Sequence, residues 1–396
     1  MVNPYFCYAF TFILALVAYM FGWSDLYPSL TLPVSLFLMT SIVVFSVFGV
    51  ITLKSNIIGF RKIEIRGHTY PLLITLFIYG LWTIEFIDTG GIPLLKILLK
   101  QPYNYRIFGV KSLHVFIVTF SSFYTIYLFH LYLSQKSRVI LILYGINLIA
   151  AILIYNRGML FFNLSATTCL YLIYKGAIHW KQIIAGSIIV IVALFFFGVL
   201  GSLRVSREAK KPYTNDDFLG IGVASESFRK SIVPDEFFWS YIYVSSPIAN
   251  LQNNVNTFPE KEYDASRVLE WMNNEILFDF ISKRINAYSN KDRESENTIP
   301  GPFNASTVYS RSFSYLRWSG LLLMSVFILI IPLGLYKLLP ASSPFFLTGV
   351  AILSTIFLFM VFDNMLRFTG LSFQMVYPVI LTWGVSNISW VKKIFQ

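Results

Sequence analysis

Arginines at the edges of apolar stretches are the residues whose type and position could do chemistry in this chain. A charge in or beside hydrocarbon costs roughly 2.5–3.5 kcal/mol on insertion scales, so each of them needs a partner. The guanidinium group stays charged and offers a planar fork of donors that matches phosphate oxygens. We therefore expect several of them to converge on one anion such as a lipid diphosphate. They are Arg157, Arg204, Arg207, Arg311 and Arg367.

A simpler role is open for each of these arginines. Long basic side chains at the end of a membrane-spanning helix extend to the lipid headgroups and orient the helix without binding a substrate. Arg204 lies directly beside an apolar stretch and suits this role well. Arg157 suits it less, because Asn156-Arg157-Gly158 is too short for a free loop.

Two carboxylates are candidate general bases toward a sugar hydroxyl. Glu85 lies inside an apolar stretch, and Asp363 lies between two such stretches. Either could take a proton, and spacing alone does not choose between them. Asp363 and Arg367 are one helical turn apart, so an internal ion pair is the alternative for both. Of the four scattered histidines, His114 is the one that we consider for function.

The familiar cofactor and metal motifs do not occur in the chain. There is no Walker loop, no dinucleotide fingerprint, no HExxH and no zinc-spaced cysteine pair. We therefore expect neither a cofactor nor a metal. Cys7 and Cys169 both lie in apolar runs, and we interpret them as packing residues.

The composition predicts an all-α polytopic membrane protein. Of the 396 residues, 56% are hydrophobic and only 13% are charged, which an ordinary soluble surface cannot accommodate. The net charge of +11 lies outside residues 204–317, which hold 14 basic and 15 acidic residues, whereas the rest holds 17 and five. Basic residues that flank apolar runs indicate membrane topology, and we exclude nucleic acid as a partner.

About ten segments are long and apolar enough to be transmembrane helices, with one large helical loop between the seventh and the eighth. A span needs about 20 mostly apolar residues. We divide the chain into helices 1–7 (residues 1–203), the large loop (204–317) and helices 8–10 (318–396). The expected spans are 3–22, 30–53, 69–87, 113–133, 138–155, 159–174, 183–203, 318–336, 344–362 and 369–390.

The distribution of Lys and Arg predicts that both termini are cytoplasmic and that the large loop is outside. With this orientation the cytoplasmic connections hold eleven Lys and Arg, and the short outer connections hold six. Four of those six, including Arg106, fall in the connection 88–112. That connection is either an ordinary surface loop or a functional basic patch.

The large loop contains its own helix signals. Residues 235–250 hold a run of aromatics, including Trp239 and Tyr243, and predict an interfacial or re-entrant helix. These two aromatics either stack on sugars or belong to an interfacial belt. Residues 265–287 predict one amphipathic helix with Asp264 as its N-cap, and residues 289–299 predict a mobile polar linker.

The layout resembles the Wzy-type polymerases of bacterial oligosaccharide repeat units, which include O-antigen and capsule polymerases. The likeness covers most of the chain. It depends on Gly91-Ile92-Pro93 with the segment from Arg106 to Leu113, on Asn156-Arg157-Gly158, and on the large outer loop. Within that loop it depends on residues 243–251 (YVSSPIANL) and 301–307 (GPFNAST).

The resemblance implies an inverting, metal-independent glycosyltransferase in a Gram-negative inner membrane. It would join repeat units carried on undecaprenyl diphosphate at the periplasmic face, with such lipids as donor and acceptor. Arg106 and the five arginines above would bind the diphosphate, and Asn304 would position the substrate. A separate chain-length regulator is a further expected partner.

Three alternatives remain open at this point. An O-antigen ligase also combines a large outer loop with arginines, but it transfers finished polymer to the lipid A core. A flippase or transporter of lipid-linked oligosaccharides would show two pseudo-symmetric halves, which the single off-centre loop disfavours. A membrane acyltransferase would need a catalytic histidine near its acyl donor.

Overall fold

The structure is a computed structural model that describes residues 2–64, 67–104, 108–177, 179–209, 215–259 and 264–395, without the side chains of residues 202–209 and 215. Helices make up 73% of it, and no strand occurs in these ranges, which confirms the predicted all-α class. An isolated β-bridge joins Ser24 to Ala224 and so ties the connection after the first helix to the large loop.

Five helices in the described ranges are long and apolar enough to cross a membrane, by length and composition: α2 (Leu32–Lys54), α3 (Thr69–Asp88), α5 (Leu113–Gln135), α8 (Trp180–Ala209) and α14 (Ser310–Leu338). Three apolar helices are shorter: α1 (Pro4–Met20), α6 (Arg138–Leu153) and α15 (Phe346–Phe359). The sixth expected span coincides with α7 (Arg157–Lys175). The chain therefore has transmembrane character, and the full set of ten crossings stays a prediction.

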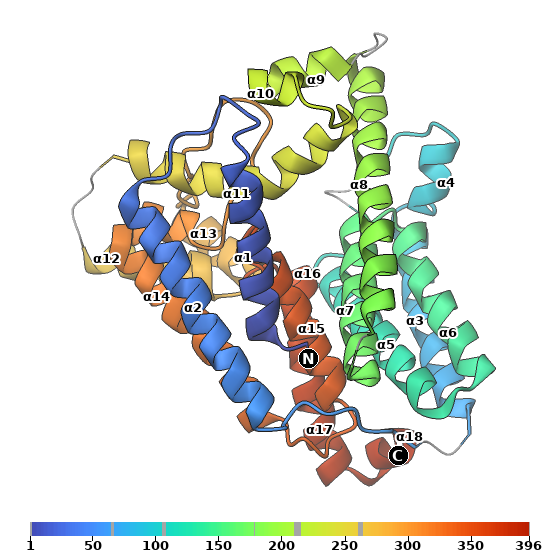
Figure 1. Cartoon of the computed structure of the whole chain (residues 1–396). Coiled ribbons are helices and arrows are strands. Elements are labelled where there is room, and N and C mark those ends of the chain that lie inside the picture. The colour runs from blue at the N-terminus through green and yellow to red at the C-terminus, as the bar shows by residue number, and fades with distance from the viewer. Residues whose placement is uncertain are drawn as a thin grey trace.

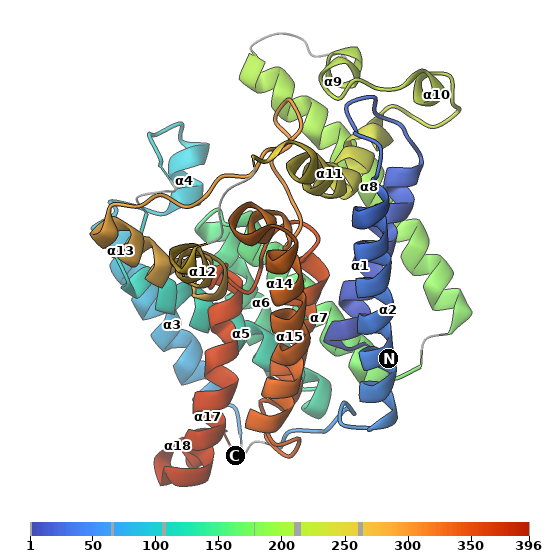
Figure 2. The same cartoon turned by 90° about the vertical axis from the view of Figure 1, so that its left-hand side faces the viewer.

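The large loop lies over one end of the helix bundle. Helices α9 (Asn215–Ile221), α10 (Glu226–Arg229) and α11 (Glu236–Thr257) lie at this end in both views, and α4 (Pro93–Leu98) lies near it (Figure 1 and Figure 2). Helices α17 (Val376–Asn387) and α18 (Ser389–Phe395) lie at the other end. We call these the cap end and the tail end. Helix α11 runs across the bundle (Figure 1), as an interfacial helix would.

Three expected elements differ in the structure. The helix expected over 265–287 is broken into α12 (Ala265–Trp271), a π-helical turn η1 (Met272–Ile276) and α13 (Asp279–Ser289). The tenth expected span, 369–390, is likewise broken into α16 (Thr369–Ser372), a short 3₁₀ turn η2 (Phe373–Met375) and α17. Apolar periodicity continued through both breaks, so the sequence pattern did not reveal them. Residues 290–299 of the expected linker are not helical, but hydrogen bonds described below fix them.

Helix α1 packs on α2, α11 and α15, and it carries a buried polar contact to the start of α14. The hydroxyls of Tyr8 and Tyr309 are 2.6 Å apart, and both side chains are fully buried. The ring of Tyr8 also stacks on Phe45 of α2 at 3.9 Å. Buried tyrosine hydroxyls need a partner, so this contact fixes where α14 begins relative to α1.

Helix α14 is kinked at Arg317, whose backbone has a positive φ of 55°. The kink directs the Arg317 guanidinium to donate a hydrogen bond to the carbonyl oxygen of Phe258 at 2.7 Å. It also brings Gly320 against the part of α14 before the kink, where a Cβ would lie 2.0 Å from the carbonyl oxygen of Ser312. The kink therefore requires glycine at position 320.

We predict that Gly320→Ala destabilises the protein by about 1–3 kcal/mol or more, because the methyl group displaces the backbone of Ser312. Gly334→Ala is the matched control in the same helix, since a Cβ there meets nothing within 4 Å. Thermal unfolding followed by size-exclusion in detergent measures both variants. Equal stability of the two variants would show that the kink has another cause.

Candidate functional site

Two buried asparagines of α11 hold the segment that leads into α14. The side chain of Asn250 donates to the carbonyl oxygens of Phe303 and Ala305 at 2.7 and 2.6 Å, and its Oδ1 accepts from the backbone of Ile299. One helical turn later, Asn254 accepts from the backbone of Asn297 at 2.8 Å. Since these backbone groups are buried or half-buried, the asparagines replace water as their partners. They fix the linker beside the bundle.

Arg311, in the first turn of α14, forms ion pairs with two acidic residues. Its guanidinium lies 3.2 Å from a carboxylate oxygen of Glu296 in the linker and 3.4 Å from Asp363 in the connection α15–α16. Backbone hydrogen bonds from Ser306 to Phe362 and from Val308 to Met360 hold the two connections side by side. The linker, the start of α14 and the connection α15–α16 thus meet at one arginine.

A second and deeper pair joins Glu275 to Arg293. Glu275 lies in the π-helical turn and is fully buried, and a carboxylate oxygen accepts from Arg293 at 2.7 Å. The side chain of Asn364 donates to the backbone carbonyl of Glu275 at 2.7 Å and to its carboxylate at 3.2 Å. A buried carboxylate needs such compensation, because unpaired burial of a charge is very costly.

Arg367 has no carboxylate within ion-pair distance in the part of the chain that the structure describes. Its side chain is half-buried, and its buried Nε has no hydrogen-bond partner there. Burial lowers the pKa of Arg367, the charges of Arg293 and Arg311 lower it further, and Glu275 and Asp279 act in the opposite direction. A partly desolvated guanidinium without a counter-ion, beside two other arginines, is suited to bind an added anion.

The backbone around Arg367 is fixed by α13. The Arg367 carbonyl oxygen accepts from the backbone of Asp279 at 3.0 Å, and the Asp279 carboxylate accepts from Thr369. Burial alone would raise the pKa of Asp279, but hydrogen bonds from Lys283 and Thr369 outweigh it and lower that pKa. Arg367 and Asp363 lie in a non-helical connection and form no ion pair with each other, so the expected pairing within one helical turn is wrong.

Of the two acidic side chains that contact Arg311, Glu296 is the less exposed to solvent. Burial raises the pKa of its carboxyl group, and the charge of Arg311 opposes that shift. The hydroxyls of Ser306 and Ser310 lie beside this carboxyl group and also oppose the rise in its pKa. Asp363, by contrast, keeps 48% of its side chain exposed. Its contact with Arg311 is therefore the more easily exchanged of the two.

Of the other predicted arginines, the structure describes the side chain of Arg157 alone. Arg157 begins α7, is exposed, and donates to the hydroxyl of Tyr155 at 3.0 Å. One and a half turns later, Phe162 packs against Phe368, the residue after Arg367, so the start of α7 lies near the connection that contains Arg367. Arg204 and Arg207 lie in α8, where only the backbone is described. Arg106 lies outside the described residues.

The remaining predicted substrate contacts divide into two groups. Asn304 is exposed and lies between the two carbonyl groups that Asn250 holds, two residues before the contact of Ser306 with Phe362. Trp239 stacks on Phe218 at 3.7 Å, and Tyr243 packs edge-on against Phe197 of α8. These two aromatics therefore contribute to the packing of α11 against α8 and its neighbours.

Glu85 and His114 form a separate pair between α3 and α5. The imidazole Nδ1 is 2.8 Å from a carboxylate oxygen of Glu85, which is fully buried, whereas His114 is 29% exposed. The rings of Trp82 and Phe108 pack around the imidazole. Gly109, with φ +88°, lies so close that a Cβ would be 2.5 Å from Nδ1, so a larger residue could not occupy this position. The other carboxylate oxygen of Glu85, Oε1, is buried without a hydrogen-bond partner among the described residues.

Sequence reasoning missed Glu275, Arg293 and Glu296. Arg293 and Glu296 lie in the segment whose polar composition predicted a mobile linker, and Glu275 lies within the amphipathic helix expected over 265–287. The described ranges hold no group of three or more His, Cys, Asp or Glu side chains placed to bind a metal ion.

Comparisons with known proteins do not assign a function to this site. The chain matches no protein-family model, no curated protein and no solved structure. The functional interpretation therefore depends on the side chains described above.

We predict that Arg293→Gln destabilises the fold by about 3–5 kcal/mol, because it leaves the buried Glu275 carboxylate unpaired. Replacing both residues, Arg293→Gln with Glu275→Gln, removes the unpaired charge and recovers most of the loss. Thermal unfolding of the two single variants and the double variant measures this coupling. The exposed pair Lys230–Glu226 is the control, since breaking it costs at most about 1 kcal/mol. Additive effects of the two buried substitutions would contradict the prediction.

Proposed function

We propose that the protein is an inverting, metal-independent glycosyltransferase that polymerises oligosaccharide repeat units carried on undecaprenyl diphosphate, as in O-antigen or capsule synthesis. The observation that carries the proposal is Arg367, a half-buried guanidinium without a carboxylate partner, placed beside Arg293 and Arg311 at the cap end. The resemblance to Wzy-type polymerases supports the same reaction.

The chemistry needs what these arginines offer. An acceptor hydroxyl attacks the anomeric carbon of the donor sugar, the bond to the diphosphate oxygen breaks, and lipid diphosphate leaves with the electron pair. Negative charge develops on that oxygen, and fixed cations in a partly desolvated site stabilise it strongly. Arg367 would bind the diphosphate first, and Arg311 would join it when the diphosphate replaces the exposed Asp363 carboxylate.

The same proposal includes a topology. The cap end would face the periplasm of a Gram-negative cell, both termini would be cytoplasmic, and ten helices would cross the inner membrane. The surplus of Lys and Arg in the connections at the tail end supports this orientation. Exposed apolar side chains on α2, α8 and α14 support burial of these helices in lipid.

Inversion favours the His114–Glu85 pair over Asp363 as the base. In an inverting displacement the acceptor attacks the sugar from the face opposite to the leaving group. The base therefore lies on the other side of the sugar from the residues that bind the diphosphate. Asp363 contacts Arg311 and would compete with the diphosphate, which argues against it. The pair belongs to other helices, and Arg284 of α13 connects that region to the cap by donating to Ser112 at 2.7 Å. In this proposal His114 takes the proton, and Glu85 is a positioning residue that orients the ring.

Two alternatives remain. An O-antigen ligase would use the same leaving group, but would attach finished polymer to the lipid A core. A flippase or transporter of lipid-linked oligosaccharides would bind the same diphosphate without forming a glycosidic bond. Loss of polymer length, as opposed to loss of attachment or of translocation, distinguishes the polymerase. A chain-length regulator would be a separate partner.

We predict that Arg367→Gln lowers polymerisation about a hundredfold to a thousandfold, because a donor to the leaving group is lost. The measurement is chain length on gels of lipopolysaccharide or capsule from a polymer-forming strain, together with transfer by the purified protein. Arg138→Gln, which removes the same charge from an exposed position at the tail end, is the control and leaves chain length unchanged. Long chains in the Arg367 variant at normal protein levels would overturn the diphosphate assignment.

We predict that His114→Gln slows transfer about a hundredfold, because the group that accepts the proton of the acceptor hydroxyl is lost. Glu85→Gln has a smaller effect, because it disorients the ring without removing it. The rate of transfer by the purified protein measures both variants, and His179→Gln, at an exposed position, is the control. An unchanged rate in His114→Gln would return the role to Asp363.

A further inference from the structure

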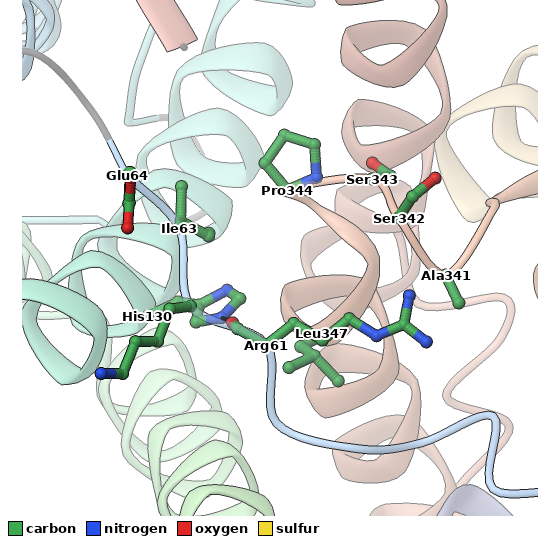
Figure 3. Close-up of a pocket in the computed structure, with 10 residues that line it drawn as sticks. Arg61, Ile63, Glu64, His130, Ala341, Ser342, Ser343, Pro344 and Leu347 are labelled. Atoms are coloured by element: carbon green, nitrogen blue, oxygen red, sulfur yellow. Dashed lines mark hydrogen bonds between the residues drawn. The ribbon is translucent and has the colours of Figure 1, made fainter.

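The tail end contains a pocket of about 480 Å³ that has no part in the proposed reaction. One wall is the connection between α2 and α3, which includes Arg61, Lys62 and Glu64. The opposite wall is the turn between α14 and α15, with Ser342, and the first turn of α15, with Leu347. His130 of α5 lies next to Arg61 (Figure 3). The pocket is therefore built from two connections that are far apart in the sequence.

The wall that carries the cations is fixed in place by α5. The Nε2 of His130, which is buried, donates to the carbonyl oxygen of Arg61 at 3.0 Å. The backbone N–H of Ile63 donates to the hydroxyl of Ser134 at 3.0 Å, and the Ile63 side chain is buried. With the backbone held at both points, the side chains of Arg61 and Lys62 are left exposed at the pocket. The two cationic side chains therefore extend from a backbone that is fixed in position.

The electrostatics of the pocket favour an anion. Arg61 and Lys62 form no ion pair within the described ranges. The one carboxylate of the lining, Glu64, lies away from the Arg61 guanidinium (Figure 3). The opposite wall adds the start of α15, whose first turn contains Leu347 and whose dipole favours negative charge there. The exposed hydroxyl of Ser342 is a further donor.

The position of the pocket relates it to the membrane surface. Apolar side chains remain exposed at the ends of the two neighbouring helices, at Leu53 of α2 and Leu338 of α14. The pocket lies just beyond these positions, where the apolar surface of the bundle gives way to charged connections. In a bilayer this is the depth of the lipid headgroups, and cations there attract anionic lipids.

We propose that this pocket binds a phosphate-bearing anion, held by Arg61, Lys62 and the start of α15. The Arg61 guanidinium offers a planar fork of donors that matches the oxygens of a phosphate group, and Lys62 adds a second positive charge to the lining. Both an anionic phospholipid headgroup and a soluble phosphate ester offer that chemistry. The pocket would bind its ligand independently of the polymerase reaction at the cap end.

The test uses the full-length protein with two probes. In the first, the protein is purified from nanodiscs that contain phosphatidylglycerol and phosphatidylcholine, and native mass spectrometry counts the retained lipids. In the second, inorganic phosphate is added to the protein in detergent, with chloride at equal ionic strength as the reference, and thermal unfolding is followed. Retention of phosphatidylglycerol assigns a lipid headgroup, and stabilisation by inorganic phosphate alone assigns a soluble ester.

Variants locate the binding. Arg61→Gln with Lys62→Gln is expected to weaken the response about tenfold or more, because two charge-assisted contacts are lost. Lys392→Gln with Lys393→Gln removes the same charge from α18 and is expected to respond as wild type. Ser342→Glu introduces a negative charge at an exposed position and, should the double variant fail to fold, is expected to abolish binding by itself. The proposal would be overturned if the Arg61/Lys62 variant and Ser342→Glu both responded as wild type does. It would also be overturned if the α18 variant lost as much binding as the Arg61/Lys62 variant.

Discussion

The fully buried carboxylate of Glu275 is the constraint on which the cap end depends. A charge at that depth must be compensated, and the partners come from two other segments: Arg293 from the linker and Asn364 from the connection α15–α16. The π-helical turn that interrupts the expected amphipathic helix places Glu275 where both can reach it. One buried charge thereby fixes three parts of the chain relative to each other.

The charges that remain after these pairings define the proposed function. Arg293 forms an ion pair with Glu275, and Arg311 forms ion pairs with Glu296 and with the exposed Asp363. Arg367, held by its backbone against α13, is left without a carboxylate in the part of the chain that the structure covers. A guanidinium that is desolvated but not neutralised raises the affinity of its surroundings for anions. In the proposed reaction, that anion is the lipid diphosphate.

The sequence predicted the helical class and placed Arg311, Asp363 and Arg367 beside apolar stretches, because a charge next to hydrocarbon is a local signal. It did not reveal Glu275 or Arg293, since their importance comes from burial that only tertiary packing creates. The linker shows the same limit: its polar composition predicts mobility, whereas Asn250 and Asn254 of another helix hold it. Aromatic type likewise did not tell which way Trp239 and Tyr243 face, and they pack beside α8.

The most direct test of the proposed function is an experimental structure of the protein with an undecaprenyl-diphosphate-linked repeat unit. We expect the diphosphate within hydrogen-bond distance of the guanidinium groups of Arg367 and Arg311, with Asp363 displaced from its contact with Arg311. We also expect the donor sugar on the side of the diphosphate that faces His114. A diphosphate bound elsewhere, with the contact between Arg311 and Asp363 intact and Arg367 without a ligand, would contradict it.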